Sequence, residues 1–215
     1  QPEAMWAAVK SDDGALHTGI LVELKARFDD FSAVLAGPGL GRSASALELV
    51  RTLVETTAKP LILDADGLFP GIEESLSRRP KDFPPVVLTP HPGEWKRIGG
   101  TAFEADGVES LLEFCRRNRT IVVLKGPRTR VADPGNVYLS PFGGPVLARG
   151  GTGDLLAGMA GSLLAQNPDD PATAAAMAAV WHGRAADCLA RAQGNWAVRT
   201  TRLLDFLPEA LGFKH

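Results

Sequence analysis

The chain has 215 residues, of which 45% are hydrophobic and 22% charged, and its formal net charge is −2 at pH 7. This composition is that of a globular domain, which excludes a disordered or fibrous protein. Because basic residues are not in excess and no apolar run approaches the roughly 20 residues that span a bilayer, we expect neither nucleic acid nor a membrane as a partner.

Four short apolar runs, at residues 32–36, 60–63, 85–88 and 120–124, each end in a polar or glycine-rich loop. The runs are continuous rather than alternating, which is typical of strands buried on both faces of a parallel sheet. Helical patterns lie between them, one capped by Ser43 or Ser45 and another carrying residues 111–115. This order predicts an open α/β sheet that binds its ligands at the carboxyl ends of the strands.

The pattern changes after the fourth run. Residues 129–132 and 136–139 flank the turn sequence DPG and predict a β-hairpin. A glycine-rich stretch then leads into an apolar helix that ends at about Gln166. Asp170 and Pro171 are expected to begin a long alanine-rich helix to about Ala192. A last helix is predicted from residue 200 or 201 to residue 211.

The two cysteines, Cys115 and Cys188, lack CxxC spacing, and each lies on the apolar side of a helical pattern. This favours buried free thiols over a disulfide or a metal site, and therefore a reducing, cytoplasmic location. The four histidines are scattered without the spacing of paired ligands, so the sequence gives no sign of a structural metal.

The strongest chemical signal is the motif GGTGD at the start of a helix, formed by Gly150, Gly151, Thr152, Gly153 and Asp154. Glycines let the backbone approach a ligand closely, and the free N–H groups of a helix start favour a phosphoryl group that carries negative charge. Asp154 has two interpretations: it stabilises the helix dipole, or it is a general base that takes a proton from an attacking hydroxyl. The motif by itself leaves both open.

Two further strand ends carry weaker signals. The loop GPGLG (residues 37–41) is neither a GxGxxG fingerprint nor a P-loop. It is either a tight strand-to-helix turn or a surface without side chains against which a flat ligand can lie. After the next strand, Asp66 is expected to cap a helix. Asp64 instead is a candidate for holding Mg²⁺ through water, as carboxylates near nucleotide phosphates do.

Three more polar side chains are candidates for ligand contacts. In TPHPGE (residues 89–94), two prolines fix the backbone around His91, which makes it a candidate substrate contact. Glu94 either caps the following helix or assists a metal or substrate. Lys125 either pairs with phosphate or is a solvated residue at the end of its strand. His182, in the long helix, is expected to contact a neighbouring helix, although it could face a nucleotide.

The motifs together resemble one family. GPGLG, LDADGL, TPHPGE, VLKG, GGTGDLLAG and WHGRAAD, in this order, look like the ADP/ATP-dependent NAD(P)H-hydrate dehydratases of the ribokinase-like superfamily. The resemblance extends from Pro2-Glu3 to the final helix. It implies a three-layer αβα fold and a lyase of metabolite repair. Such an enzyme removes water from hydrated NADH or NADPH, with ADP or ATP as the phosphoryl donor and Mg²⁺ as a cofactor.

The resemblance also implies residue roles. Asp154 would be the catalytic base and would contact the hydrate, together with Gly39, His91 and Glu94. The residues that would bind the adenine nucleotide are Lys125, Gly126, Pro127, Arg128, Thr129, Gly150, Gly151, Thr152 and Gly153. Family analogy further implies a homo-oligomer, a tetramer. Whether the donor is ADP or ATP, and whether the substrate derives from NADH or NADPH, stays open.

The chain departs from the family in two places. Ser140 and Gly144 stand where the family often has asparagines. The family's amino-terminal strand-helix-strand portion would precede Pro2-Glu3, and we expect it to be missing before Gln1. Residues 1–215 are therefore expected to form a single domain without that portion, with an exposed apolar sheet edge.

Two other functions stay open on the residues alone. A small-molecule kinase of the same superfamily, acting on a sugar, a thiazole or a pyrimidine, would share GGTGD but should lack the TPHPGE frame. A non-catalytic nucleotide-binding module, inactive through loss of the amino-terminal portion, would bind nucleotide without turnover.

Overall fold

A six-stranded sheet with the strand order β3-β4-β5-β6-β7-β8 organises the part of the chain that the structure describes. The structure is a computed structural model that describes residues 4–9, 11–12, 15–16, 19–20, 24, 27–100 and 107–212. The first four strands are parallel, and the last two form an antiparallel hairpin at the side of β6. The strands of this sheet are β3 (Val34–Ala36), β4 (Leu61–Leu63), β5 (Val86–Leu88), β6 (Thr120–Leu124), β7 (Arg130–Ala132) and β8 (Val137–Leu139).

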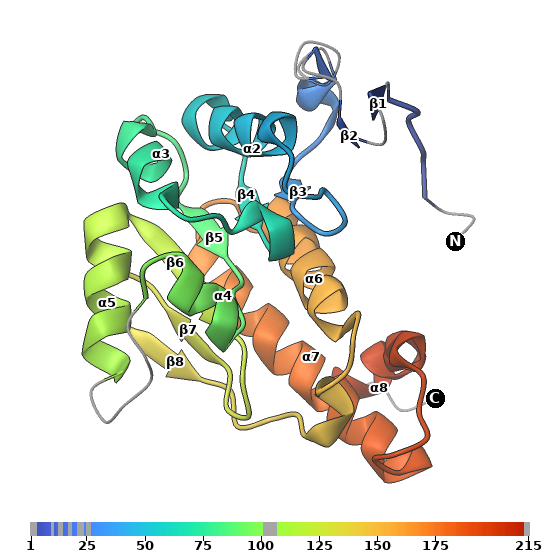
Figure 1. The fold of residues 1–215 in the computed structure, drawn as a ribbon. Coiled ribbons are helices and arrows are strands. Elements are labelled where there is room, and N and C mark those ends of the chain that lie inside the picture. Colours follow the sequence, from blue (N-terminus) through green and yellow to red (C-terminus); the bar gives the residue numbers. More distant parts are fainter. Residues whose placement is uncertain are drawn as a thin grey trace.

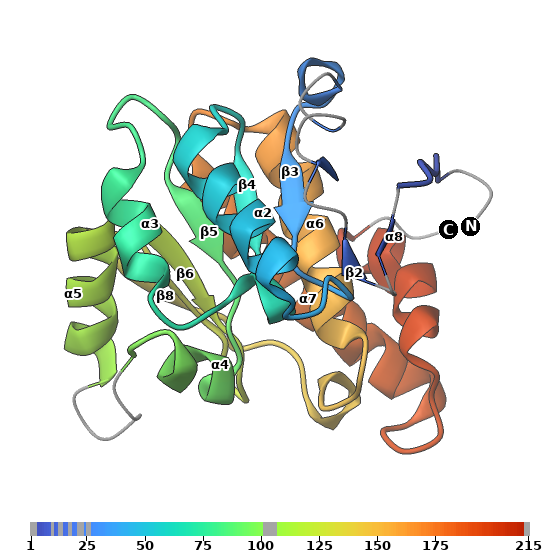
Figure 2. The same cartoon turned by 45° about the horizontal axis from the view of Figure 1, so that its top comes forward.

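Helices cover both faces of this sheet (Figure 1). One face carries α2 (Ala44–Thr56), α3 (Ile72–Arg78) and α5 (Gly107–Asn118), and the other carries α6 (Thr152–Gln166) and α7 (Pro171–Gln193). The turned view shows the parallel strands between these two helical layers (Figure 2). The remaining described elements are β1 (Ser11–Asp12), β2 (Ala15–Leu16), η1 (Phe28–Asp30), η2 (Ala65–Gly67), α4 (Pro92–Arg97), η3 (Pro145–Leu147), η4 (Thr200–Phe206) and α8 (Leu207–Ala210).

The alternation of side chains along the strands explains the two layers. In β4, Leu61 and Leu63 point to the face of α2 and α3, whereas Ile62 points to the face of α6. Every residue of β4, β5 and β6 is buried, because helices cover both faces there. Continuous apolar runs are therefore what these strands require, as the sequence predicted. The expected three-layer α/β architecture is confirmed.

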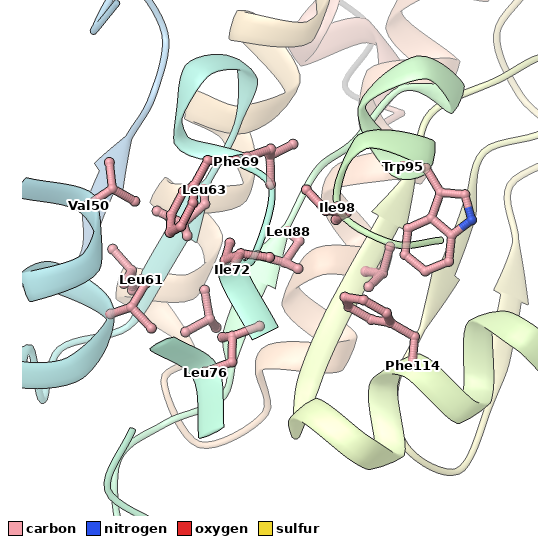
Figure 3. Close-up of a cluster of buried hydrophobic side chains, with 14 of the residues drawn as sticks. Val50, Leu61, Leu63, Phe69, Ile72, Leu76, Leu88, Trp95, Ile98 and Phe114 are labelled. Carbon is pink, nitrogen blue, oxygen red and sulfur yellow. The ribbon is translucent and has the colours of Figure 1, made fainter. Parts of the chain in front are cut away.

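The two faces differ in the size of their side chains. Large residues fill the face of α2, α3 and α5, among them Trp95 and Phe114, whose rings meet edge to face with centroids 4.9 Å apart (Figure 3). The α6 and α7 face is rich in alanine, for example Ala160 and Ala178. Small residues let helices lie close to the sheet and to each other, and this holds the start of α6 at the carboxyl edge.

Most predicted boundaries agree with the structure. Ser43 caps α2 by accepting a hydrogen bond from the Ala46 N–H at 3.2 Å, and Asp170 caps α7 by accepting from the Thr173 N–H at 3.0 Å. In the hairpin turn, Asp133 Oδ1 accepts from the N–H of Gly135 at 2.6 Å. The predicted last helix is confirmed in extent, and it begins as a 3₁₀ helix at residues 200–206 and continues as an α-helix at residues 207–210.

Both cysteines are free and buried, and burial raises the pKa of the Cys115 thiol to about 12. No helix within the described ranges combines the length and apolar character needed to cross a bilayer. At one edge of the described sheet, Leu35 of β3 is 37% exposed. Gln1, Pro2 and Glu3, where the resemblance begins, lie outside the described residues, and the single-domain assignment for 1–215 stays a prediction.

Candidate active site

The loops that follow β3 and β4 pack backbone against backbone at the carboxyl edge of the sheet. Gly37 has a φ of +132°, and a Cβ at this position would lie 1.7 Å from the carbonyl oxygen of Asp64. A Cβ at Gly67 would likewise lie 2.7 Å from the carbonyl oxygen of Ala36. Only glycine allows this approach. Gly39, by contrast, has a φ of +70° and open space around it, so the loop presents bare backbone to solvent.

Asp66 joins the same two loops. Its carboxylate accepts hydrogen bonds from the Gly41 N–H at 3.1 Å and from Arg42 Nε at 2.9 Å. The prediction that Asp66 caps a helix is therefore wrong. Sequence spacing pointed to the nearest helix start, but the chain folds a more distant loop against this carboxylate, which lies 25 residues from Gly41 along the chain.

The TPHPGE segment forms a closed capping box at the start of α4. His91 Nδ1 accepts hydrogen bonds from the N–H groups of Gly93 at 3.0 Å and Glu94 at 3.2 Å. Glu94 Oε2 accepts in return from the His91 N–H at 2.8 Å. Because Nδ1 is an acceptor, the proton of the neutral ring lies on Nε2, which faces Glu94 Oε1 at 3.4 Å. The histidine side chain itself is 56% exposed and can meet a ligand.

Two buried carboxylates, those of Asp64 and Glu94, face Lys125 beside this capping box, which we call the His91 frame. Lys125 Nζ donates to Asp64 Oδ1 at 2.7 Å and lies 3.7 Å from Glu94 Oε2. The side chains of Asp64 and Glu94 are only 2% and 8% exposed. Lys125 is therefore not the solvated strand-end residue that was one of its two interpretations. A buried carboxylate requires such a partner, because desolvation of an unpaired charge is costly.

A cavity of about 500 Å³ opens beside this lysine, a size typical of small-molecule sites. Its walls are mostly apolar, and its polar end is formed by Lys125 and the start of α6. A side chain at Gly153 would bring its first carbon within 3.2 Å of Lys125 Nζ, so the glycine keeps this end open. The lining residues are Lys125, Gly126, Pro127, Thr129, Gly144, Pro145, Leu147, Ala148, Thr152, Gly153, Leu156 and His182.

His182 lines the cavity from α7 while remaining 95% buried, since its exposed fraction is 5%. Burial, aided by the positive charge of Lys125 and partly offset by the backbone of Thr152, lowers the pKa of His182 to about 4. The imidazole is therefore neutral at neutral pH. His182 is thus a buried residue of α7, as expected, and it also lines the cavity.

The GGTGD motif forms a sharp turn into α6. Gly151 occupies the N-cap position with a φ of +85°, and Thr152 Oγ1 donates to the carbonyl oxygen of Leu147 at 2.8 Å. Asp154 follows in the first turn of α6, and its side chain has no hydrogen bond or ion pair with any residue in the described ranges. It is exposed at the surface of the site. This carboxylate is therefore available to a ligand.

A segment from the far end of the chain braces this turn. Thr200 Oγ1 donates to the carbonyl oxygen of Gly150 at 2.9 Å. The guanidinium of Arg149 donates to the carbonyl oxygen of Asn195 and, at 3.0 Å, to that of Trp196. Neither Arg149 nor Thr200 is predicted from the sequence as a residue of the site. No local pattern signals them, because each acts on residues about 50 positions away.

The structure brings many of the predicted site residues together. Six of the nine predicted nucleotide contacts line the cavity, while Arg128, Gly150 and Gly151 lie outside its lining. Gly144, at one of the two positions where the resemblance leads us to expect asparagine, is also in the lining. Ser140, at the other position, is buried, and its hydroxyl has no hydrogen-bond partner among the described residues. Gly39 and His91 are exposed beyond the cavity, on the loops after β3 and β5.

The part of the chain that the structure describes offers few ligands for a metal ion. Within the described ranges, no group of three His, Cys, Asp or Glu side chains is arranged to hold a metal ion. Asp64 is a buried carboxylate that accepts from Lys125 of the cavity lining, and its Oδ2 would lie 3.9 Å from a Cβ at Gly153. This arrangement fits Mg²⁺, which keeps several waters and commonly binds through one or two carboxylates plus substrate phosphates.

Comparisons with known proteins agree with one another. The family model for NAD(P)H-hydrate dehydratase matches residues 7–209. The bifunctional NAD(P)H-hydrate repair enzyme Nnr of Moorella thermoacetica is 38% identical over 202 residues, which cover 92% of this chain and 38% of that protein. The chain therefore spans well under half the length of this curated relative.

Two solved structures are similar as well. The ADP/ATP-dependent NAD(P)H-hydrate dehydratase from Bacillus subtilis, co-crystallized with ATP/Mg²⁺, matches with a TM-score of 0.74 and 34% identity, covering 84% of this chain and 64% of that one. A ribokinase-like superfamily protein from Enterococcus faecalis matches with a TM-score of 0.74 and 27% identity, covering 91% and 68%. The three-layer arrangement of helices, sheet and helices is thus a ribokinase-like fold.

Proposed function

The chain belongs to the NAD(P)H-hydrate dehydratase family, and we propose that it removes water from hydrated NADH or NADPH with an adenine nucleotide as phosphoryl donor. One observation carries the proposal. The carboxylate of Asp154, which has no partner among the described residues, comes directly after Gly153, and Gly153 lines the cavity together with Lys125. A base for a hydroxyl and a site for a phosphoryl group thus lie within one helical turn.

The need for a phosphoryl donor follows from the leaving group on the ring of the hydrate. Hydroxide is a poor leaving group, and phosphate is a good one. Asp154 would take the proton of the ring hydroxyl while that oxygen attacks the terminal phosphorus of the nucleotide. The products of this step are a phosphate ester and AMP from ADP, or ADP from ATP.

In the second step, the lone pair of the ring nitrogen expels inorganic phosphate. A proton then leaves the adjacent ring carbon, and the double bond of NADH or NADPH returns. The elements of water have been removed, with its oxygen in the phosphate.

The backbone at the start of α6 serves the first step. Negative charge develops on the transferred phosphoryl oxygens, and the N–H groups at a helix start stabilise such charge. Lys125 adds a positive charge at the same end of the cavity. The apolar walls, which include Pro127, Leu147 and Leu156, suit the nucleoside part of the donor. Asp64 would face Mg²⁺ through water, and the ion, when bound, offsets the charge of the phosphates.

The proposal extends to partners and location. Besides the hydrate and the nucleotide, we propose a homo-oligomer, which the family resemblance implies. A cytoplasmic location is supported by the two free, buried cysteines, since reduced thiols are typical of that compartment. Sedimentation of the purified protein measures the oligomeric state directly.

The test is a product assay. The protein is incubated with hydrated NADH and ADP, and in parallel with ATP, and the return of NADH absorbance is followed together with released phosphate and AMP or ADP. We expect equal amounts of NADH, phosphate and spent nucleotide, and no reaction when the nucleotide is left out. Hydrated NADPH in a matched series identifies the preferred substrate.

The rival functions give different results in the same assay. A small-molecule kinase would leave hydrated NADH untouched and would accumulate a stable phosphorylated product from its own substrate. A non-catalytic nucleotide-binding module would bind ADP in a calorimeter with no NADH formed. Either outcome would overturn the proposed function.

A further inference from the structure

One network of charges connects the two ligand sites. It runs from His91, on the loop after β5, through Glu94 to Lys125 at the polar end of the cavity, and on to Asp64. The distances are 3.4 Å from His91 Nε2 to Glu94 Oε1, 3.7 Å from Glu94 Oε2 to Lys125 Nζ, and 2.7 Å from Lys125 Nζ to Asp64 Oδ1. The backbone N–H of Lys125 also donates to the carbonyl oxygen of Pro90 at 2.8 Å, so the two loops are tied together twice.

Glu94 sits at the centre of this network and is not placed to meet the hydrate itself. Its side chain is only 8% exposed, and both carboxylate oxygens face protein donors. Oε2 accepts from the His91 N–H at 2.8 Å, and Oε1 faces His91 Nε2 and, at 4.0 Å, Arg97. A buried carboxylate in this position acts through its neighbours, which makes it a positioning residue.

We propose that Glu94 couples the nucleotide site to the hydrate site, by sharing its charge between Lys125 and the frame of His91. This inference rests on the proposed function, because it takes Lys125 as a phosphate contact and His91 as a hydrate contact. When the nucleotide phosphates attract Lys125, the lysine compensates Glu94 less. The carboxylate of Glu94 then interacts more strongly with the backbone N–H and the ring Nε2–H of His91. The capping box that holds the histidine in place becomes more stable.

The sign of the coupling follows from this exchange. Bound nucleotide strengthens the His91 frame, so each ligand should bind more tightly in the presence of the other. Reciprocity requires the same factor in both directions. Because Lys125 is 19% exposed and lies 3.7 Å from Glu94, we expect a factor at the lower end of the usual range, roughly fivefold.

The substitution Glu94→Gln isolates the charge. A glutamine at this position of a capping box still accepts a hydrogen bond from the His91 N–H, so the helix start is kept. The negative charge that faces Lys125 is lost. A purely structural role predicts weaker binding of both ligands in this variant. Coupling through charge predicts instead that nucleotide alone binds at least as tightly as in the wild type, because one anion beside Lys125 is gone.

The experiment measures binding by calorimetry on the full chain, with a non-cleavable ADP analogue whose phosphates are joined by a methylene group, and with NADH as the dinucleotide. Each dissociation constant is measured with and without the other ligand. The wild type should show the roughly fivefold factor in both orders of addition, and Glu94→Gln should show a factor near one with a melting temperature close to that of the wild type.

A matched control makes the same chemical change elsewhere. Glu73 pairs with Arg117 and Asn118 where α3 and α5 meet, remote from the cavity lining. Glu73→Gln should keep the wild-type coupling factor. The inference is overturned if Glu94→Gln couples as strongly as the wild type, or if the wild type binds both ligands independently. If the wild type instead turns over no hydrate in the product assay, the proposed function fails on its own terms.

Discussion

The carboxyl edge of the sheet has two sides that satisfy their polar groups differently. On the closed side, the loops after β3, β4 and β5 bond to one another: Gly37 packs on Asp64, Asp66 binds Gly41 and Arg42, and the His91 frame closes on itself. On the open side, the GGTGD turn and the loop after β6 border a cavity and leave Asp154 unpaired among the described residues.

Because of this difference, substitutions on the two sides should change different quantities, the free energy of unfolding on one side and activity on the other. Groups on the closed side are satisfied within the protein, so changes there should lower the free energy of unfolding. On the open side, Asp154 has no partner among the described residues, so its substitution should lower activity and leave stability intact. The predictions below, from the largest expected effect to the smallest, test this separation.

Asp154→Asn probes the open side. The amide cannot take a proton, and loss of a general base commonly lowers kcat by about 100- to 10,000-fold. Because Asp154 has no partner within the described residues, the melting temperature should stay close to that of the wild type. Kinetics with hydrated NADH and ADP, combined with calorimetric melting, measure both. Wild-type turnover in this variant would rule out Asp154 as the base.

Gly37→Ala probes the closed side. A Cβ 1.7 Å from the carbonyl oxygen of Asp64 cannot be accommodated without moving backbone, and φ is +132°. We expect a loss of about 2–4 kcal/mol in the free energy of unfolding, from overpacking and strain together. Gly41→Ala is the control, because its φ is +75° but the space around it is open. That variant should lose only about 1 kcal/mol in urea unfolding. Equal losses would mean that the close approach does not matter.

His182 makes stability depend on pH. Its folded-state pKa is about 4 against an ordinary value of 6.5, so the unfolded chain takes up the proton first as the pH falls. The contribution of neutral His182 to the free energy of unfolding is therefore complete above pH 6.5, and it is lost as the pH falls from there through 4. The loss attributable to this group approaches about 3 kcal/mol. His182→Gln should remove this component, and the difference between the two pH profiles of unfolding measures it. Parallel profiles would contradict the assignment.

His91→Ala should lower the free energy of unfolding only slightly. The cap on α4 is lost, which costs about 1 kcal/mol. His91→Asn is the matched variant, because asparagine caps well but lacks the ring. We expect it to unfold like the wild type and yet to bind the hydrate more weakly, with a raised KM. If both variants keep the wild-type KM, His91 is part of the frame alone.

The sequence predicted what depends on local pattern. The three buried strands β4, β5 and β6, the caps Ser43 and Asp170, and the glycine turn before α6 all follow from residue types at short spacing, whereas β3, predicted to be buried as well, is partly exposed at the edge of the sheet. The grouping of Lys125 with Gly153 at one cavity is predicted by the family resemblance, which implies a nucleotide contact for both residues.

Contacts between distant loops could not be predicted in this way. Asp66 binds Gly41 rather than its own helix, and Thr200 reaches Gly150, 50 residues earlier. Likewise, no periodicity distinguishes a histidine that faces a cavity, as His182 does, from one that packs on a helix. These partners are chosen by the tertiary arrangement, which lies beyond any spacing rule.

The fate of the ring hydroxyl oxygen tests the central claim most directly. Hydrated NADH is prepared with a heavy oxygen isotope in its ring hydroxyl and is converted in the presence of ADP, and the products are examined by mass spectrometry. If the open side phosphorylates that hydroxyl, the label appears in inorganic phosphate, in an amount equal to the NADH formed. Label released into water, with unlabelled phosphate, would contradict phosphorylation of the hydroxyl and the role of Asp154 as its base.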